Sequence, residues 1–331
     1  QRQWAEWTVQ AVNRMFPDVK FINWPRCERY LSHAQTCVTY IAQWDMKSAE
    51  AARLLDQLGT YFLQHGQYID AEELLEQGLK IREQLFGPQH LEVAHSLGNL
   101  GLLHYYQYRD HQAEPLYQRA LEINEQLLGP THPTLTGILH YLGDLYYNQD
   151  QFTQAVYYCQ RAQTILEQTP EAEPSDFAMN LSSLGLTYYK QKKYVEAELL
   201  LKQALEIDTK TLGADHPDVA TQLTHLARLY HDQGKDTEAE FLFQRALTIR
   251  EQTLGPSALA VAASLHLLAN YYGDQGKPVE AEPLFSRAMT IVRQRLAPTH
   301  PLRIEILRDY SDLLQKMGQG AKARRLISQE K

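Results

Sequence analysis

The stretch LGNLGLLHYYQYRDHQAEPLYQRALEINEQLLGPTHP, residues 97–133, decides the fold because its pattern recurs along the chain at a fixed interval. A leucine recurs every 42 residues, and a small residue follows each leucine. The pairs are Leu58 and Gly59, Leu100 and Gly101, Leu142 and Gly143, Leu184 and Gly185, Leu226 and Ala227, Leu268 and Ala269, with Tyr310 and Ser311 at the next step. A fixed period of this length marks a repeat architecture in which each unit contacts only its neighbours.

Two further registers also hold small residues. They are Ala71, Ala113, Ala155, Ala197, Ala239, Ala281 and Ala323, then Gly78, Ala120, Ala162, Ala204, Ala246 and Ala288. Helices approach closely only where side chains are small, and larger apolar residues fill the remaining space. Leu97, Leu100 and His104 lie on one helical stripe. Each period therefore predicts a helix, a short turn and a second helix, so the expected class is all-α.

Turn and link signals separate these helices. Gln64-His65-Gly66 and Asp232-Gln233-Gly234 are typical of turns within a repeat. Leu128-Gly129-Pro130-Thr131-His132-Pro133 and its copy at 212–217 link one repeat to the next. We expect the glycine to end a helix in the left-handed conformation and the final proline to begin the next helix. The link histidine is expected to make local hydrogen bonds. The third repeat departs from the pattern at Val156 and in its acidic link, 167–175.

Composition narrows the classes of function. The chain has 331 residues, 44% hydrophobic, and a net charge of −8, which disfavours nucleic acid as a partner. No apolar run reaches the roughly 18 residues needed to span a membrane, and the start, Gln1-Arg2-Gln3-Trp4, is no signal peptide. It also lacks an initiator Met, which predicts a piece of a longer protein. The three cysteines, Cys27, Cys37 and Cys159, favour reduced thiols and a cytoplasmic location, without a disulfide or a metal site.

An enzyme is not expected. The sequence contains no His-Glu-x-x-His, no Gly-x-Ser-x-Gly and no phosphate loop, and no Cys/His spacing typical of a metal site. His225, Arg228 and Asp232 share one helical face, for which ligand contact or solvation is favoured over catalysis. We therefore predict neither a catalytic residue nor a cofactor nor a metal.

Residues 1–48 lie outside the repeat and hold all four tryptophans. Helices are expected from about Gln3 to Phe16 and from about Pro25 to Trp44. The favoured interpretation is a helical cap over the apolar side of the first repeat. A ligand-binding aromatic cluster is the alternative.

The spacing, Leu-Gly-Asn-Leu-Gly at 97–101, Ala-Glu-Pro-Leu-Tyr-Gln-Arg-Ala-Leu at 113–121 and the Leu-Gly-Pro-x-His-Pro link resemble 42-residue tetratricopeptide repeats of the kinesin-light-chain type. The resemblance covers roughly residues 50–331. It implies a right-handed superhelical solenoid of six repeats and a C-terminal seventh, with the N-terminal helical cap before them. It also implies a function in binding peptides or proteins.

Residues 1–48 resemble something more particular. The strings Arg2–Glu6, Ala11–Val19 and Trp24–Ala34 are similar to the stretch that precedes the repeat arm in bacterial STAND (NB-ARC) signalling ATPases. This implies a ligand-sensing arm whose nucleotide-binding part lies outside the sequence, so that ATP or ADP would bind only there. A freestanding scaffold or cargo adapter, or a receptor for signalling peptides, is the alternative.

The resemblance also implies a ligand groove lined by the first helix of each repeat. The residues carried over from it are Asn99, Tyr105, Tyr106, His140, Tyr141, Asp144, Tyr147, Asn148, Ser183, Tyr189, Lys190, His225, Arg228, His231, His266 and Asn270. Tyrosine and arginine are the residue types that carry most interface energy. The clamp for a terminal carboxylate is not kept, because Asn99 has no asparagine at the same register in the other repeats.

Overall fold

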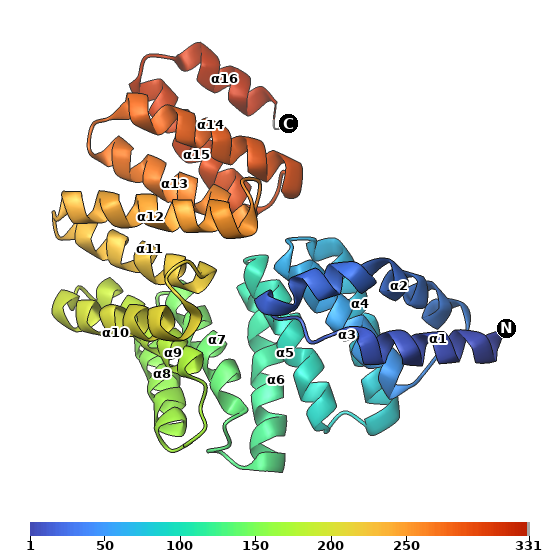
Figure 1. Ribbon diagram of the computed structural model, residues 1–331. Helices are drawn as coiled ribbons and strands as arrows, with labels where there is room; N and C mark the ends of the chain where they lie inside the picture. The colour runs from blue at the N-terminus through green and yellow to red at the C-terminus, as the bar shows by residue number, and fades with distance from the viewer. Residues whose placement is uncertain (330–331) are drawn as a thin grey trace. The chain divides into compact units, whose positions relative to one another are not determined.

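The computed structural model describes residues 1–329, which form sixteen α-helices and one short 3-10 helix, η1 (Phe21–Asn23), without strands (Figure 1). The helices are α1 Arg2–Met15, α2 Trp24–Gln43, α3 Ala49–Gln64, α4 Tyr68–Phe86, α5 Leu91–Tyr106, α6 Asp110–Leu128, α7 Leu135–Asn148, α8 Phe152–Glu167, α9 Pro174–Lys190, α10 Tyr194–Leu212, α11 Pro217–Asp232, α12 Asp236–Leu254, α13 Leu259–Asp274, α14 Pro278–Arg295, α15 Pro301–Lys316 and α16 Gly320–Ser328. The predicted all-α fold of repeated helix pairs is confirmed. None of these helices is both long enough and apolar enough to cross a membrane.

The small registers lie where the two helices of a repeat touch. A Cβ added to Gly101 would stand 2.9 Å from ring atoms of Tyr117, and one added to Gly185 would stand 3.0 Å from Cγ of Leu201. The facing alanines, Ala113 and Ala197, are fully buried. Close approach between α5 and α6, and between α9 and α10, therefore requires these residues, as the 42-residue period predicts.

The turn inside every repeat has the same backbone conformation, whatever residue occupies it. The position that ends the turn has a positive φ of 57–73° in all seven repeats. Its occupants are Gly66, Tyr108, Asp150, Lys192, Gly234, Gly276 and Gly318. Glycine adopts this left-handed region without a steric cost, whereas tyrosine, aspartate and lysine do not. The position within the repeat, and not the identity of the residue there, therefore determines the positive φ of this turn.

The links between repeats correct one expectation and confirm another. Gly213 has φ 91° and ψ 155°, which is a positive φ with extended ψ and not the left-handed helical conformation expected. The chain must leave α10 in an extended direction to reach α11, and only glycine enters that region easily. The link histidines do make local hydrogen bonds, since Nδ1 of His216 accepts from the backbone N–H of Asp218 at 3.2 Å. His90 and His300 cap α5 and α15 in the same way.

Cross-repeat ion pairs recur on the side of the second helices. Glu72 of α4 bonds Arg109 at 3.0 Å, and Glu198 of α10 bonds Lys235 at 3.2 Å. In the third repeat Val156 stands where five others have glutamate, and the corresponding cation, Lys193, lies 5.2 Å from the ring centroid of Tyr188. The sequence departure at Val156 therefore removes the ion pair and keeps the cation–π contact, which Lys235 and Lys277 make beside their own ion pairs.

The N-terminal helices α1 and α2 pack against α3. Arg53 of α3 donates to the backbone oxygen of Asn13 at 2.9 Å, and the indole of Trp24 donates to Gln64 at 2.8 Å. Trp4 and Trp7 remain 70% and 51% exposed and touch each other edge to face. Trp24 and the apolar residues of α1 and α2 therefore cover the first repeat. Trp4 and Trp7 lie outside this apolar contact. The boundary near residue 49 remains a prediction.

The chain divides into two compact units, Gln1–Leu145 and Tyr146–Lys331, here called unit 1 and unit 2. Unit 1 holds the N-terminal helices, the first two repeats and most of α7. Unit 2 holds the remainder, with its described part ending at residue 329. All three cysteines are buried free thiols.

Candidate functional site

The predicted ligand residues lie on the first helices of their repeats, but they belong to different units. Unit 1 contains Asn99, Tyr105, Tyr106, His140, Tyr141 and Asp144. Unit 2 contains Tyr147, Asn148, Ser183, Tyr189, Lys190, His225, Arg228, His231, His266 and Asn270. Within each unit many of these side chains contact the first helix of a neighbouring repeat.

A polar ladder makes this join in unit 2. Its bonds connect residues 43 positions apart, which is one repeat plus one residue. Tyr189 donates to Asp232 at 2.7 Å, and Nε2 of His231 lies 3.3 Å from Asp274. Oγ of Ser182 lies 2.9 Å from Nδ1 of His225. Residues that the family resemblance assigns to ligand contact thus also hold neighbouring repeats together.

The predicted ligand residues also differ in how far their side chains are exposed. His140, Ser183 and His266 are at most 6% exposed, so neighbouring residues cover their side chains in this conformation. Burial, with smaller contributions from Arg228 and Arg250, lowers the pKa of His225 to about 3, and the imidazole is therefore neutral at physiological pH. These four residues stay predictions as ligand contacts.

Unit 1 concentrates its aromatic residues around Tyr141. Its ring stacks on that of buried Tyr117 at 5.5 Å and lies 5.8 Å from that of Tyr105. Tyr105 donates to Asp144 at 3.4 Å. Burial, and then the Asp144 carboxylate, raise the pKa of Tyr105 well above its ordinary value, so the phenol remains a neutral donor. Tyr106, which is 46% exposed, is the open member of this cluster.

An open pocket of about 320 Å³ adjoins this cluster. Its walls are mainly apolar, and its polar members include His95 of α5 and Asn124 of α6. Two of the predicted residues, Asn99 and Tyr141, line it. Gly98 of α5 and Gly137 of α7 also line it, and a Cβ at either would meet no atom within 4 Å. The space is large enough for an apolar side chain of a partner.

A buried charge network that sequence reasoning missed lies beside this pocket. Asp56 of α3, which is fully buried, lies 3.2 Å from Arg82 and 3.1 Å from Nδ1 of His95, and Asn99 donates to it at 3.0 Å. Burial alone would raise the pKa of Asp56, but His95, Arg82 and Asn99 outweigh burial and lower it. Asp56 in turn raises the pKa of His95. The sequence offered one signal for this charge network, namely that Asp56 is a polar residue at a register that faces the next repeat.

Unit 2 presents two cations over tyrosine rings. Nζ of Lys190 lies 5.9 Å from the ring centroid of Tyr147, and the guanidinium of Arg228 lies 5.9 Å from that of Tyr189. Within residues 1–329, neither Lys190 nor Arg228 forms an ion pair with a carboxylate. We call Tyr147, Tyr189, Lys190 and Arg228 the cation–aromatic face. It can offer charge and flat apolar area to one ligand.

Comparisons with known proteins identify the repeats of this chain. The family profile described as "Tetratricopeptide repeat" matches residues 50–126, 109–168, 176–252 and 260–329. A nucleotide-binding leucine-rich repeat (NLR)-like protein of Hyaloscypha variabilis is 32% identical over 90 residues, which are 27% of this chain and 9% of that protein. The chain thus matches only a small part of this relative's length.

Two solved structures are similar to this chain, and the second of them, at the higher TM-score, supports the same fold. A provisional kinesin light chain of Podosopora anserina with nearly identical TPR-like repeats is 26% identical, at a TM-score of 0.47, over 63% of this chain and 99% of that one. A Rap protein complexed with Competence and Sporulation Factor is 13% identical, at a TM-score of 0.62, over 88% of this chain and 81% of that one. Repeats of this type generally bind proteins and are typically non-catalytic. With the profile covering most of its length, the chain belongs to the tetratricopeptide repeat family.

Proposed function

We propose that this chain is the ligand-sensing arm of a larger STAND-type signalling ATPase, and that its ligand is a protein or an extended peptide. The observation that carries the binding part is the cation–aromatic face of unit 2. Lys190 and Arg228 lie over Tyr147 and Tyr189, and neither pairs with a carboxylate in the part of the chain that the structure describes. An incoming acidic or carbonyl-rich segment would supply oxygen partners to these two cations.

Rigidity of the face supports a recognition role. Tyr189 is fixed by its hydrogen bond to Asp232, and burial followed by that bond raises its pKa above the ordinary value. An anchored phenol loses little conformational entropy when a partner binds, and Arg and Tyr are enriched among residues that dominate interface energy. Exposed Asn148 lies beside Tyr147 in the chain and offers an amide to a peptide backbone.

The sensor-arm part rests on residues 1–48 and on one relative. The strings Arg2–Glu6, Ala11–Val19 and Trp24–Ala34 resemble the stretch that joins the ATPase region to the repeat arm in STAND proteins. The 90-residue match to an NLR-like protein is compatible with the same organisation. Any nucleotide chemistry would then belong to sequence outside this chain.

Binding is tested by comparing two triple variants. Partners of the wild-type chain are captured from the native host, identified by mass spectrometry and titrated by calorimetry. We expect Tyr147→Ala/Tyr189→Ala/Arg228→Ala to keep its helical content and to weaken binding by at least about 100-fold, since anchors of this kind carry about 2 kcal/mol each. The control, Tyr157→Ala/Lys202→Ala/Arg245→Ala, removes one tyrosine and two cations from second helices and should bind normally. If the two variants bound the partner with equal affinity, the cation–aromatic face would not be the binding surface.

The sensor-arm assignment has a separate test. The parent reading frame should encode a nucleotide-binding domain with a phosphate loop before residue 1, and the captured partner should increase ATP hydrolysis by the full-length protein. A frame without that domain would overturn the sensor-arm assignment. It would leave a freestanding scaffold, a cargo adapter or a signalling-peptide receptor, with the binding face unchanged.

A further inference from the structure

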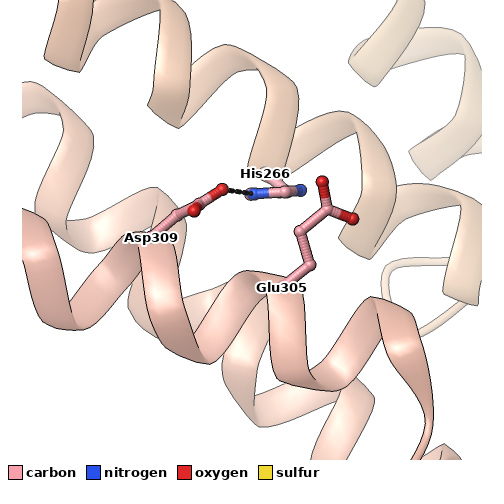
Figure 2. Close-up of side chains that lie close together, drawn as sticks. All are labelled: His266, Glu305 and Asp309. Carbon is pink, nitrogen blue, oxygen red and sulfur yellow. Dashed lines mark hydrogen bonds and ion pairs between the residues drawn. The ribbon is translucent and has the colours of Figure 1, made fainter.

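Three metal-ligating side chains meet at the C-terminal end of unit 2. His266 of α13 is buried and lies between two carboxylates of α15, Glu305 and Asp309 (Figure 2). One ligand atom from each residue lies within 4.8 Å of the others. The two carboxylates are one helical turn apart, so both point toward the imidazole from the same face of α15.

The donor set matches a particular class of ion. One imidazole and two carboxylates offer two negative charges and a borderline nitrogen, as in zinc sites with three protein ligands and an open position. Zinc bonds to such ligands are about 2.0–2.2 Å long, which places ligand atoms roughly 3–3.5 Å apart. The group therefore has to contract by about 1 Å. Exposed Glu305 has the free side chain that allows this movement.

The surrounding residues hold the other two ligands in place. Asp309 Oδ2 lies 2.8 Å from Nε2 of His266, and Asn270 Nδ2 lies 3.0 Å from the same nitrogen. Arg308 donates to the second oxygen of Asp309 at 3.0 Å, which leaves Oδ2 directed at the imidazole. Burial alone would raise the pKa of Asp309, but hydrogen bonds from His266, Arg308 and Asn270 lower it. An outer partner such as Arg308, which binds the Asp309 oxygen that does not face the imidazole, is typical of metal sites, and Asn270 would release Nε2 when the ion binds.

We propose that His266, Glu305 and Asp309 bind a divalent transition-metal ion, zinc best, which joins the first helices of the sixth and seventh repeats. The sequence predicted no metal, because the three ligand residues come from two neighbouring repeats and form no local spacing motif. Nitrogen favours zinc over magnesium or calcium, which prefer a larger set of oxygen ligands. The ion would act at the last repeat, where an array with only nearest-neighbour contacts is least supported.

The test is a zinc titration of the complete chain, with purification tags removed and metal stripped by chelation. Calorimetry with ZnCl₂ should show one site in the wild-type chain. Glu305→Gln changes only an exposed side chain and should weaken that site by at least about tenfold, since even outer-sphere changes cost 10–100-fold. Glu280→Gln, which removes an exposed charge from α14, should leave it intact. MgCl₂ should bind more weakly than ZnCl₂.

A second measurement reports the position of the ion. Amide hydrogen exchange in α15 and α16 should slow when zinc is added to the wild-type chain, and this protection should disappear in Glu305→Gln. Zinc affinity that is the same in Glu305→Gln and Glu280→Gln, or zinc binding without protection of α15, would overturn the proposal. His266→Gln serves as a further ligand deletion, and its circular dichroism spectrum shows whether the buried position still folds.

Discussion

Lys192 offers the clearest quantitative test of how the repeat enforces its turn. It occupies the left-handed position with φ 61°, where four other repeats have glycine, and its side chain is exposed. A non-glycine residue in this region costs about 1–2 kcal/mol, and glycine loses about 0.5–1 kcal/mol more backbone entropy on folding. We therefore expect Lys192→Gly to stabilise the chain by about 0.5–1 kcal/mol.

The assay is thermal unfolding followed by circular dichroism, together with amide exchange at the α9–α10 turn. A gain of that size raises the midpoint of the transition by about 1–4 °C. Lys192→Ala keeps the strain and should change little. Gly234→Ala, at the same register of the next repeat with no atom within 4 Å of its added Cβ, should lose about what Lys192→Gly gains. If Lys192→Gly destabilises the chain while Gly234→Ala is neutral, the backbone explanation of this register is refuted.

Two further predictions concern packing and pH. Gly101→Ala should lose about 1 kcal/mol or more in thermal unfolding, because overpacking against the buried Tyr117 ring, 2.9 Å away, exceeds the gain of about 1 kcal/mol in helix propensity. Gly98→Ala, one turn earlier with open space at its Cβ, should instead gain about 1 kcal/mol. Burial raises the pKa of Asp208 to about 6, so its ionisation destabilises the folded state as pH rises from 4 through 6. Asp208→Asn should raise the urea midpoint at pH 7.5 and not at pH 4, and an equal rise at both would contradict this.

The fold was predictable because its determinants recur. Leu100 and Gly101 repeat every 42 residues with the same neighbours, so one repeat specifies the rest. The extended backbone at Gly213 was not predictable, because glycine alone does not distinguish two positive-φ conformations. The sequence also did not show which residues of the first helices face a partner. His225 and Ser183 have the polarity of contact residues, but His225 bonds Ser182 of the preceding repeat and Ser183 is buried, which depends on the neighbouring helix.

The metal-ligating group and the Asp56 network were missed for a related reason. Each combines residues from adjacent repeats, His266 with Asp309 and Asp56 with His95, and such pairs have no signature within one helix. The cation–aromatic face was partly predicted, since its residues were carried over from the family resemblance. The pairing of Lys190 with the ring of Tyr147 emerged only in three dimensions.

Uniform turn geometry has a consequence for how such a chain changes over generations. Since tyrosine, aspartate, lysine and glycine all take the same backbone angles at that position, the local sequence is free to vary while the spacing is kept. A duplication or deletion of one whole 42-residue segment would join two compatible ends and leave every remaining interface in register. Insertions of other lengths would not. Array length is therefore the property that this architecture can alter most readily, and with it the extent of surface offered to partners.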